Sequence, residues 1–310
     1  MNVRDFEYIV EIARSGSILK ASKTLFISQP ALSQFLKRIE FETGTLLFQR
    51  VGHNLVPTFA GEECIRIAKE ILFLNNQLDN ILSDVAHKNR GEIRFGLPLS
   101  RGSYFISSIL PQFHKLYPGI KVNIFEEATK ILLKKLRLGE LDLIIINVTQ
   151  DEQYEDLQYK ILCQEEMILA APDEFHLETK SFIHKDYMYP CLKPEDWIEF
   201  PFIALTEGQR SYVFAEKYMI KHEIKPQINF SIRNLAQAIF AVQQGLGLTI
   251  CPSMPIDTDK IKYFSLYDSP EGGKLPVGIV YRKDAYISKI EKILIEICSK
   301  NYNKKKTTRN

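Results

Sequence analysis

The sequence has few cysteines, a single tryptophan and almost no net charge. With a formal charge of +2 over 310 residues, a polycationic surface is excluded, so any contact with nucleic acid must depend on a local patch and on shape. The cysteines are widely spaced and include no Cys-x-x-Cys pair, a pattern that predicts neither a zinc site nor a disulfide framework. They are Cys64, Cys163, Cys191, Cys251 and Cys298.

Long apolar runs are also missing. The longest uncharged run, residues 234–256, contains three glutamines, two glycines and two prolines, which is typical of a helix, turn and strand in a core rather than a membrane span. Charged residues at Arg4, Asp5, Glu7 and Glu11 occupy the place where a signal peptide would need an apolar core. We therefore expect a cytoplasmic protein with reduced thiols and no membrane partner.

Common catalytic motifs do not occur. There is no Gly-x-Ser-x-Gly elbow, no His-Glu-x-x-His and no P-loop, and the six histidines form no i, i+4 pair. We predict that the chain is not an enzyme and holds neither a metal nor an organic cofactor. The apolar fraction of 45% and the charged fraction of 25% are those of an ordinary globular protein, and the length predicts two or three domains.

The first sixty residues predict a run of short helices. After Gly16, Ser17 is placed to cap a second helix, and Ser28 to cap a third. In the third helix an apolar stripe lies about 180° from a polar stripe. The apolar stripe is Leu32, Phe35, Leu36 and Ile39, and the polar stripe is Pro30, Ser33, Gln34 and Lys37. This is the pattern of a recognition helix, although an ordinary amphipathic surface helix has the same spacing.

The wider sequence distinguishes these alternatives. The stretch from Phe6 to Gly61 closely resembles the winged helix-turn-helix of LysR-type transcriptional regulators; the matching positions include Gly16-Ser17, Ser28-Gln29-Pro30-Ala31-Leu32-Ser33, Ile39-Glu40, Leu47-Phe48, Pro57-Thr58 and Ala60-Gly61. The resemblance implies a DNA-binding domain over residues 1–58, with the helix-turn-helix at about Ile18–Lys37 and a wing at about Gln49–Pro57. The DNA-binding residues it implies are Ser28, Gln29, Pro30, Ser33, Gln34, Lys37, Arg50, His53 and Asn54.

One long helix is expected after Thr58, spanning a linker of residues 59–89. Apolar residues at alternating spacings of four and three predict a heptad seam for a second chain. Its members are Cys64, Ala68, Ile71, Asn75, Leu78, Leu82 and Val85. A lone asparagine in such a seam can fix register and partner number. The alternative is a single core helix that tolerates Asn75.

Beyond residue 90 the pattern alternates between short apolar runs and helical stretches, which predicts parallel sheets with crossover helices. Two such blocks resemble the type 2 periplasmic-binding-protein-like sensor of the same regulators, so the predicted fold is α/β overall with an all-α winged helix-turn-helix at the start. We expect an effector domain over residues 90–300, with lobe I at about 90–163 and 268–300 and lobe II at about 164–267. A basic flexible tail is expected at 301–310.

Ligands of open α/β sheets bind beyond the carboxyl ends of the strands, where helices begin. Three expected loops carry hydroxyl, amide and guanidinium groups there, suited to a small anion such as a carboxylate. The candidate effector ligands are Ser100, Arg101, Ser103, Thr129, Thr206, Gln209 and Arg210. Plain helix capping is the alternative role for each, and for Thr129 or Ser103 alone it is the stronger one.

Together these features predict a LysR-type regulator that binds double-stranded promoter DNA as a homodimer or homotetramer and responds to a small anionic effector. RNA polymerase is a further candidate partner. The alternatives are a redox-responsive regulator of the same fold and a cytoplasmic small-molecule-binding protein without gene regulation.

Overall fold

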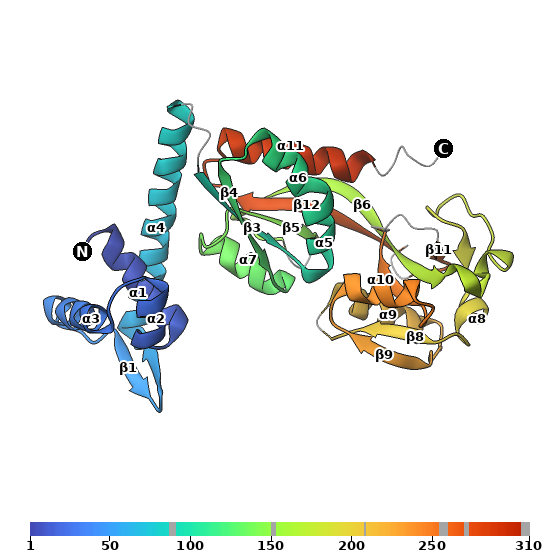
Figure 1. Ribbon diagram of the computed structural model, residues 1–310, viewed down its shortest axis with the longest axis horizontal. Coiled ribbons are helices and arrows are strands. Elements are labelled where there is room, and N and C mark those ends of the chain that lie inside the picture. Colours follow the sequence, from blue (N-terminus) through green and yellow to red (C-terminus); the bar gives the residue numbers. More distant parts are fainter. Residues whose placement is uncertain (87–90, 150–152, 208, 254–259, 270–272, 305–310) are drawn as a thin grey trace.

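The computed structural model describes residues 1–86, 91–149, 153–207, 209–253, 260–269 and 273–304. It is a mixed α/β chain in which a small N-terminal domain, a long helix and two α/β lobes follow one another (Figure 1). No helix in these ranges is long and apolar enough to cross a membrane.

The N-terminal domain contains α1 (Val3–Ser15), α2 (Ile18–Thr24), α3 (Gln29–Thr43) and the antiparallel hairpin of β1 (Phe48–Val51) and β2 (Asn54–Pro57). The expected caps are confirmed, because Ser17 accepts from the backbone N–H of Lys20 and Ser28 from that of Ala31. The apolar stripe of α3 is also confirmed: Leu32, Phe35, Leu36 and Ile39 are all buried in the core of this domain.

Helix α4 (Phe59–Val85) leaves this domain and is the long helix at the upper left of Figure 1. It begins at the predicted cap, where the Thr58 hydroxyl accepts from the N–H of Gly61 at 3.1 Å. Gly61 permits a close approach of backbones, since a Cβ there would lie 1.9 Å from the carbonyl oxygen of Leu47. The wing and the long helix are therefore packed directly on each other.

Lobe I is a sheet covered on both faces. Its strands β3 (Gly91–Leu97), β4 (Ile120–Glu126), β5 (Leu143–Asn147) and β12 (Lys274–Arg282) lie in the order β4-β3-β5-β12. One face packs on α6 (Leu110–Leu116) and α11 (Lys289–Lys304), and the other on α7 (Thr129–Arg137). A π-helical turn, Phe105–Ile109, joins the short α5 (Gly102–Tyr104) to α6.

Lobe II is built around the second half of β6 (Leu157–Pro172), which pairs there with β10 (Thr249–Pro252) and β11 (Ile261–Leu266). β11 also pairs with the short β7 (Cys191–Leu192). A separate parallel pair, β8 (Phe202–Leu205) and β9 (Ile228–Ile232), accompanies α8 (Pro194–Trp197), α9 (Arg210–Lys221) and α10 (Leu235–Gln243).

Strand β6 connects the lobes, because residues 157–166 pair with β12 and residues 167–172 with the strands of lobe II. The C-terminal end differs from expectation. Helix α11 continues to Lys304, and Tyr302 is only 2% exposed in the core of lobe I. Residues 301–304 are therefore part of a helix rather than of a flexible tail, since an aromatic side chain anchors them; residues 305–310 lie outside the described residues.

Candidate DNA-binding surface and effector cleft

The polar face of α3 is open to solvent. Of the nine predicted DNA contacts, Ser33 is half-buried and the other eight are exposed. The hydroxyl of Ser28 is partly engaged, because it caps α3. The face that carries Gln29, Gln34 and Lys37 thus lies opposite the buried stripe, the geometry that a helix in a DNA groove requires.

Three hydrogen bonds fix the wing to α3 and to Gly16 at the end of α1. Glu40 of α3 accepts from the backbone N–H groups of Leu47 (2.8 Å) and Phe48 (3.1 Å) at the start of β1. At the other strand, the N–H of Leu55 donates to the carbonyl of Gly16 at 2.8 Å. The hairpin that presents Arg50, His53 and Asn54 is therefore held by backbone bonds rather than by side-chain packing alone. Glu40, one of the positions that match the LysR-type pattern, thus has a structural role: its carboxylate accepts two backbone hydrogen bonds at the start of the wing.

One face of α4 is committed to lobe I of the same chain. Arg282 forms an ion pair with Glu70 and lies 4.1 Å from the centre of the Phe73 ring. Further along, Asp84 accepts from the hydroxyl of Tyr286 at 2.9 Å. Glu70, Phe73 and Asp84, at positions i, i+3 and i+14, share one face of α4. Only the remaining faces of the helix are therefore free to contact another molecule.

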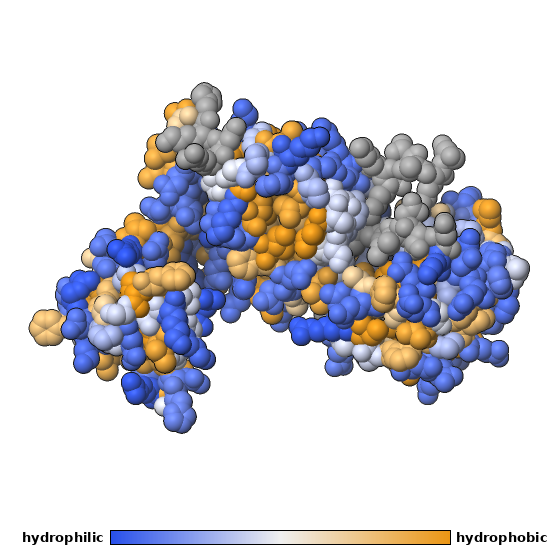
Figure 2. Space-filling view, viewed as in Figure 1, coloured by the Kyte–Doolittle hydropathy of each residue, from blue (hydrophilic) through white to orange (hydrophobic). Residues whose placement is uncertain are grey.

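The predicted seam on α4 needs correction at its N-terminal end. Ala68 is fully buried and Cys64 packs on the core of the N-terminal domain, so neither belongs to an open seam. Asn75 is half-buried, and its amide donates to Asp79 at 3.4 Å. Leu78, Leu82 and Val85 of the predicted seam are exposed. A neighbouring row of apolar residues shares Ile71, Leu78 and Val85 with the seam and adds the exposed Ile67, Leu74 and Ile81; orange side chains are visible along the upper part of α4 (Figure 2). We call this row the α4 stripe; its residues are Ile67, Ile71, Leu74, Leu78, Ile81 and Val85.

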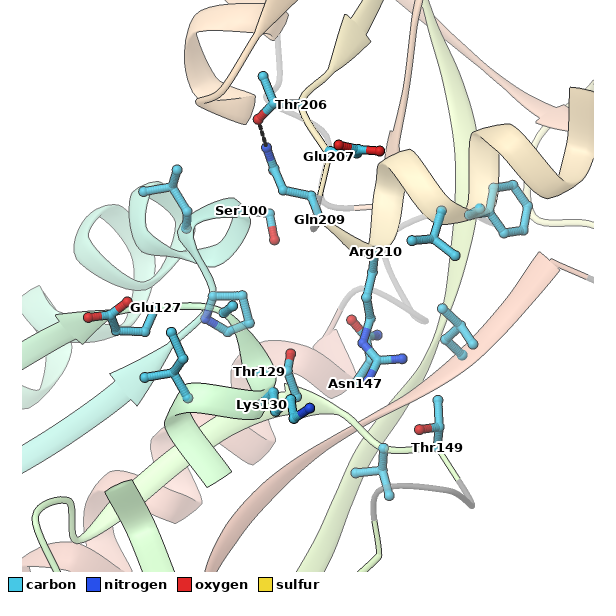
Figure 3. Close-up of a pocket in the computed structure, with 18 of the residues that line it drawn as sticks. Ser100, Glu127, Thr129, Lys130, Asn147, Thr149, Thr206, Glu207, Gln209 and Arg210 are labelled. Carbon is cyan, nitrogen blue, oxygen red and sulfur yellow. Dashed lines mark hydrogen bonds between the residues drawn. The ribbon is translucent and has the colours of Figure 1, made fainter. Parts of the chain in front are cut away.

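A cleft of about 1060 Å³ lies between the two lobes. Five of the seven predicted effector ligands line it. Ser100 follows β3, Thr129 begins α7, and Thr206, Gln209 and Arg210 lie between β8 and the first turn of α9. Figure 3 shows Arg210 extending from α9 toward the side of the cleft where Asn147, Thr129 and Lys130 are drawn. The structure thus brings together loops separated by about a hundred residues.

Arg101 does not line this cleft, and the prediction for it is wrong. Its side chain is 1% exposed and its guanidinium pairs with the buried Glu165 of β6 at 2.6 Å. It also donates to the Asn147 amide oxygen at 3.0 Å and to the Tyr302 hydroxyl at 3.4 Å. Burial disfavours the charged guanidinium, but the Glu165 carboxylate outweighs that effect and holds the pKa of Arg101 above its ordinary value.

Ser103 is exposed but does not line the cleft either, because the chain turns into α5 just before it. Thr129 does line the cleft and is not a cap, since α7 is preceded by Ala128 with no capping side chain. Within the described residues, the hydroxyls of Thr129 and Ser100 make no hydrogen bond. The capping alternative therefore does not describe Thr129.

Sequence reasoning missed Asn147 and Thr149, which line the cleft at the end of β5. The rule that selected the loops after the other strands would have found them, had it been applied to the third strand of lobe I. Asn147 also touches the buried pair, because its amide nitrogen donates to Glu165 at 3.3 Å. The buried ion pair of Arg101 and Glu165 therefore lies directly behind the cleft wall at Asn147.

The charges of the cleft are unevenly divided. The lining residues of lobe II include three cations, Arg210, Lys217 and Arg233, against one carboxylate, Glu207. Gln209 fixes this wall, because its amide donates to the Thr206 hydroxyl (3.2 Å) and to the backbone carbonyl of Arg233 (2.8 Å). The oxygen of the same amide is buried and has no hydrogen-bond donor among the described residues. The lobe II wall thus offers positive charge, and the lobe I wall adds the carboxylates Glu126 and Glu127.

The cysteines are free thiols, three of them buried. Burial raises the pKa of Cys191 to about 11 and that of Cys251 to about 12, and it also raises the pKa of Cys298 and Cys64. Thiols with raised pKa values are poor nucleophiles at neutral pH. Within the described ranges, no cluster of His, Cys, Asp and Glu is arranged to hold a metal ion.

Family models match both parts of the chain. Residues 86–302 match the LysR substrate binding domain, and residues 3–62 match the bacterial regulatory helix-turn-helix protein of the lysR family. Among curated proteins, the HTH-type transcriptional regulator YcgK of Bacillus subtilis is 28% identical over 312 residues, covering 96% of this chain and 94% of YcgK. The DNA-binding transcriptional dual regulator OxyR of Escherichia coli is 25% identical over 286 residues, covering 91% of this chain and 90% of OxyR.

Solved structures show the same fold. A full-length OxyR variant from Pseudomonas aeruginosa matches with a TM-score of 0.65 at 23% identity, covering 98% of this chain and 95% of that one. Full-length CbnR in complex with its target DNA matches with a TM-score of 0.61 at 18% identity, covering 97% and all of the two chains respectively. This chain therefore belongs to the LysR family and is a DNA-binding transcriptional regulator with an effector-binding domain.

Proposed function

We propose that two copies of the chain bind a partly palindromic promoter site, each placing α3 in a major groove. The observation that carries this proposal is the exposed polar face of α3, held opposite a fully buried stripe. Gln29, Ser33 and Gln34 supply amide and hydroxyl groups for base edges, and Lys37 supplies a charge for phosphate. Arg50 on the wing contacts the neighbouring backbone.

The copies pair through the α4 stripe. Leu74 is 60% exposed and Leu78 is 52% exposed, although both are large apolar side chains on a regular helix. Their spacing of four, with Ile67 and Ile81 one heptad on either side of Leu74, is the spacing of a two-helix seam. Burying this stripe against its copy removes apolar surface from water and orients the two recognition helices.

The inter-lobe cleft binds a small anionic effector. Positive charge from Arg210 and Arg233 on lobe II favours a carboxylate or another oxyanion. The free hydroxyls of Ser100 and Thr129 line the same space from lobe I and can accept a hydrogen bond from a ligand. An anion that also carries a hydroxyl or amino group can pair with the cations of lobe II and donate to these hydroxyls of lobe I, so we favour hydroxy and amino acids over simple carboxylates.

Effector binding changes the angle between the lobes, and thereby the spacing of the two DNA-binding domains and the bend of the DNA. A ligand that contacts both walls favours the closed arrangement, because only that arrangement satisfies Ser100 and Arg210 together. The strand β6 carries the motion, since it is shared by the two lobes.

A nuclease footprint on the DNA flanking this protein's own gene tests the DNA-binding part. The assay is run with and without a pool of small hydroxy and amino acids. We expect protection over several helical turns that changes with the pool. Protection that ignores the pool would contradict the effector part alone. A site is then sought by capture of bound genomic DNA, and failure of both assays would contradict the DNA-binding part.

Two variants separate the functions. Ser33→Ala with Gln34→Ala should abolish specific DNA binding while leaving the effector-induced shift in Tm intact. Arg210→Gln should do the reverse. Loss of both activities in either variant, with a lowered Tm, would show misfolding rather than a role in recognition.

A further inference from the structure

The turn between α2 and α3 contains an unusual residue. Helix α2 ends at Thr24, and the backbone N–H of Ile27 returns to the carbonyl of Ser22 at 3.0 Å while that of Phe26 returns to Lys23 at 3.4 Å. This pair of bonds is a Schellman motif, in which the residue at the position of Phe26 takes a left-handed conformation. Phe26 has φ +54°, where glycine or asparagine is usual.

Phe26 is costly to the fold in two ways. A bulky side chain in the left-handed region is strained, because its Cβ crowds the backbone. The ring is also 93% exposed, the most exposed of the large apolar side chains in the described part of the chain. Asparagine would make the same turn with less strain and no exposed ring, so the ring gives the fold nothing that asparagine would lack. Strain that the fold itself does not need is characteristic of functional sites.

The position of Phe26 shows what the ring could contact. It lies two residues before Ser28, the cap of α3, and so beside the N-terminal turn that carries Gln29 and Pro30. In the major groove, the apolar group that base edges offer is the C5-methyl of thymine. The other apolar contact with DNA, a wedge between base steps, is made from the minor groove, where α3 does not enter.

We infer that Phe26 is a specificity-determining residue that contacts a thymine methyl group at the edge of the sequence read by α3. The inference rests on the proposed docking of α3 in the major groove. It adds an aromatic contact to a face of α3 that otherwise presents amides, hydroxyls, a lysine and the Pro30 ring. It predicts a preference for thymine over cytosine at one position of each half-site, flanking the bases read by Gln29 and Gln34.

The test compares Phe26→Asn with Phe41→Asn in the full-length chain. Phe41 is a matched control, because it is 88% exposed in the same domain but lies within α3, in a regular helical conformation. Wild-type protein first enriches its sites from a random duplex library. Failure to enrich any motif would contradict the proposed DNA docking itself, and with it this inference.

On the enriched site, we expect Phe26→Asn to raise Tm, because strain is relieved, and to weaken binding about tenfold. Replacing the contacted thymine by deoxyuridine, which removes only the methyl group, should weaken wild-type binding and leave Phe26→Asn binding unchanged. Phe41→Asn should bind as the wild type does. Unchanged affinity of Phe26→Asn, equal loss on every sequence, or indifference of the wild type to deoxyuridine at every thymine would overturn the inference.

Discussion

The guanidinium of Arg101 lies 2.6 Å from the carboxylate of Glu165, and the two side chains are only 1% and 3% exposed. The pair joins the loop after β3 to the strand that links the lobes, and Asn147 of the cleft wall bonds to both partners. An arginine that resembled an effector ligand in the sequence is thus a support of the cleft instead.

Arg101→Met should lower the free energy of unfolding by about 3–5 kcal/mol, because it leaves a buried carboxylate without its partner. The double variant Arg101→Met with Glu165→Met should lose less, since no charge remains buried. Urea unfolding measures both. Arg66→Met, which removes the exposed ion pair with Glu63, is the control and should cost about 0–1 kcal/mol. A single variant as stable as this control would contradict the account of the pair.

Leu74→Lys with Leu78→Lys should convert a dimer into a monomer in light scattering, because charge on the α4 stripe opposes pairing. Glu63→Lys, an exposed change elsewhere on α4, should leave the oligomeric state unchanged. Asn75→Leu distinguishes the predicted heptad seam, which contains Asn75, from the α4 stripe, which does not. It should alter assembly if the seam contains Asn75, as the heptad pattern predicts, and should not if the exposed stripe is the contact.

Glu291→Gln should flatten the pH dependence of stability. Burial raises the pKa of the Glu291 carboxyl from 4.5 to about 7. Because the folded value lies above the unfolded one, the associated stability is complete below about pH 4.5 and is lost as the pH rises through 7. At about 1.4 kcal/mol per pKa unit, the loss at pH 8 is on the order of 3 kcal/mol.

The measurement is urea unfolding at pH 5 and pH 8. Glutamine keeps the bonds between Ser288 and position 291 that begin α11, so the variant should gain stability at pH 8 relative to the wild type. Glu62→Gln, an exposed carboxylate at the start of α4, should change neither value. An unaltered pH profile in Glu291→Gln would refute this assignment.

Lys37→Gln should weaken DNA binding by a similar factor on specific and random duplexes. Losing one phosphate contact should also lower the slope of log affinity against log salt concentration by about 1. Titrations at several salt concentrations give both quantities. Lys115→Gln, an exposed lysine on lobe I, is the control. A loss confined to the specific duplex would mean that Lys37 reads a base instead.

Local signals in the sequence determined the N-terminal domain. Ser17, Ser28 and Thr58 cap their helices as predicted, and the stripe from Leu32 to Ile39 is buried as its spacing requires. These features depend on residues within one or two turns of each other, and helical periodicity and capping are local in the same way. The alternation of strands and helices likewise predicted two α/β lobes.

Only the tertiary structure decided whether Arg101, Tyr302 and each face of α4 are buried, and which partners they contact. Arg101 meets its partner 64 positions away, and Tyr302 a further 137 positions along the chain. The face of α4 that stays exposed depends on which face packs on lobe I. Glu70 and Phe73 pack there because Arg282, more than 200 residues later in the chain, contacts them. Each of these side chains can bond to several kinds of partner. The fold determines which partner it meets, because a buried charged or polar group must be paired, and its partner comes from a part of the chain too distant for any local sequence pattern to reveal.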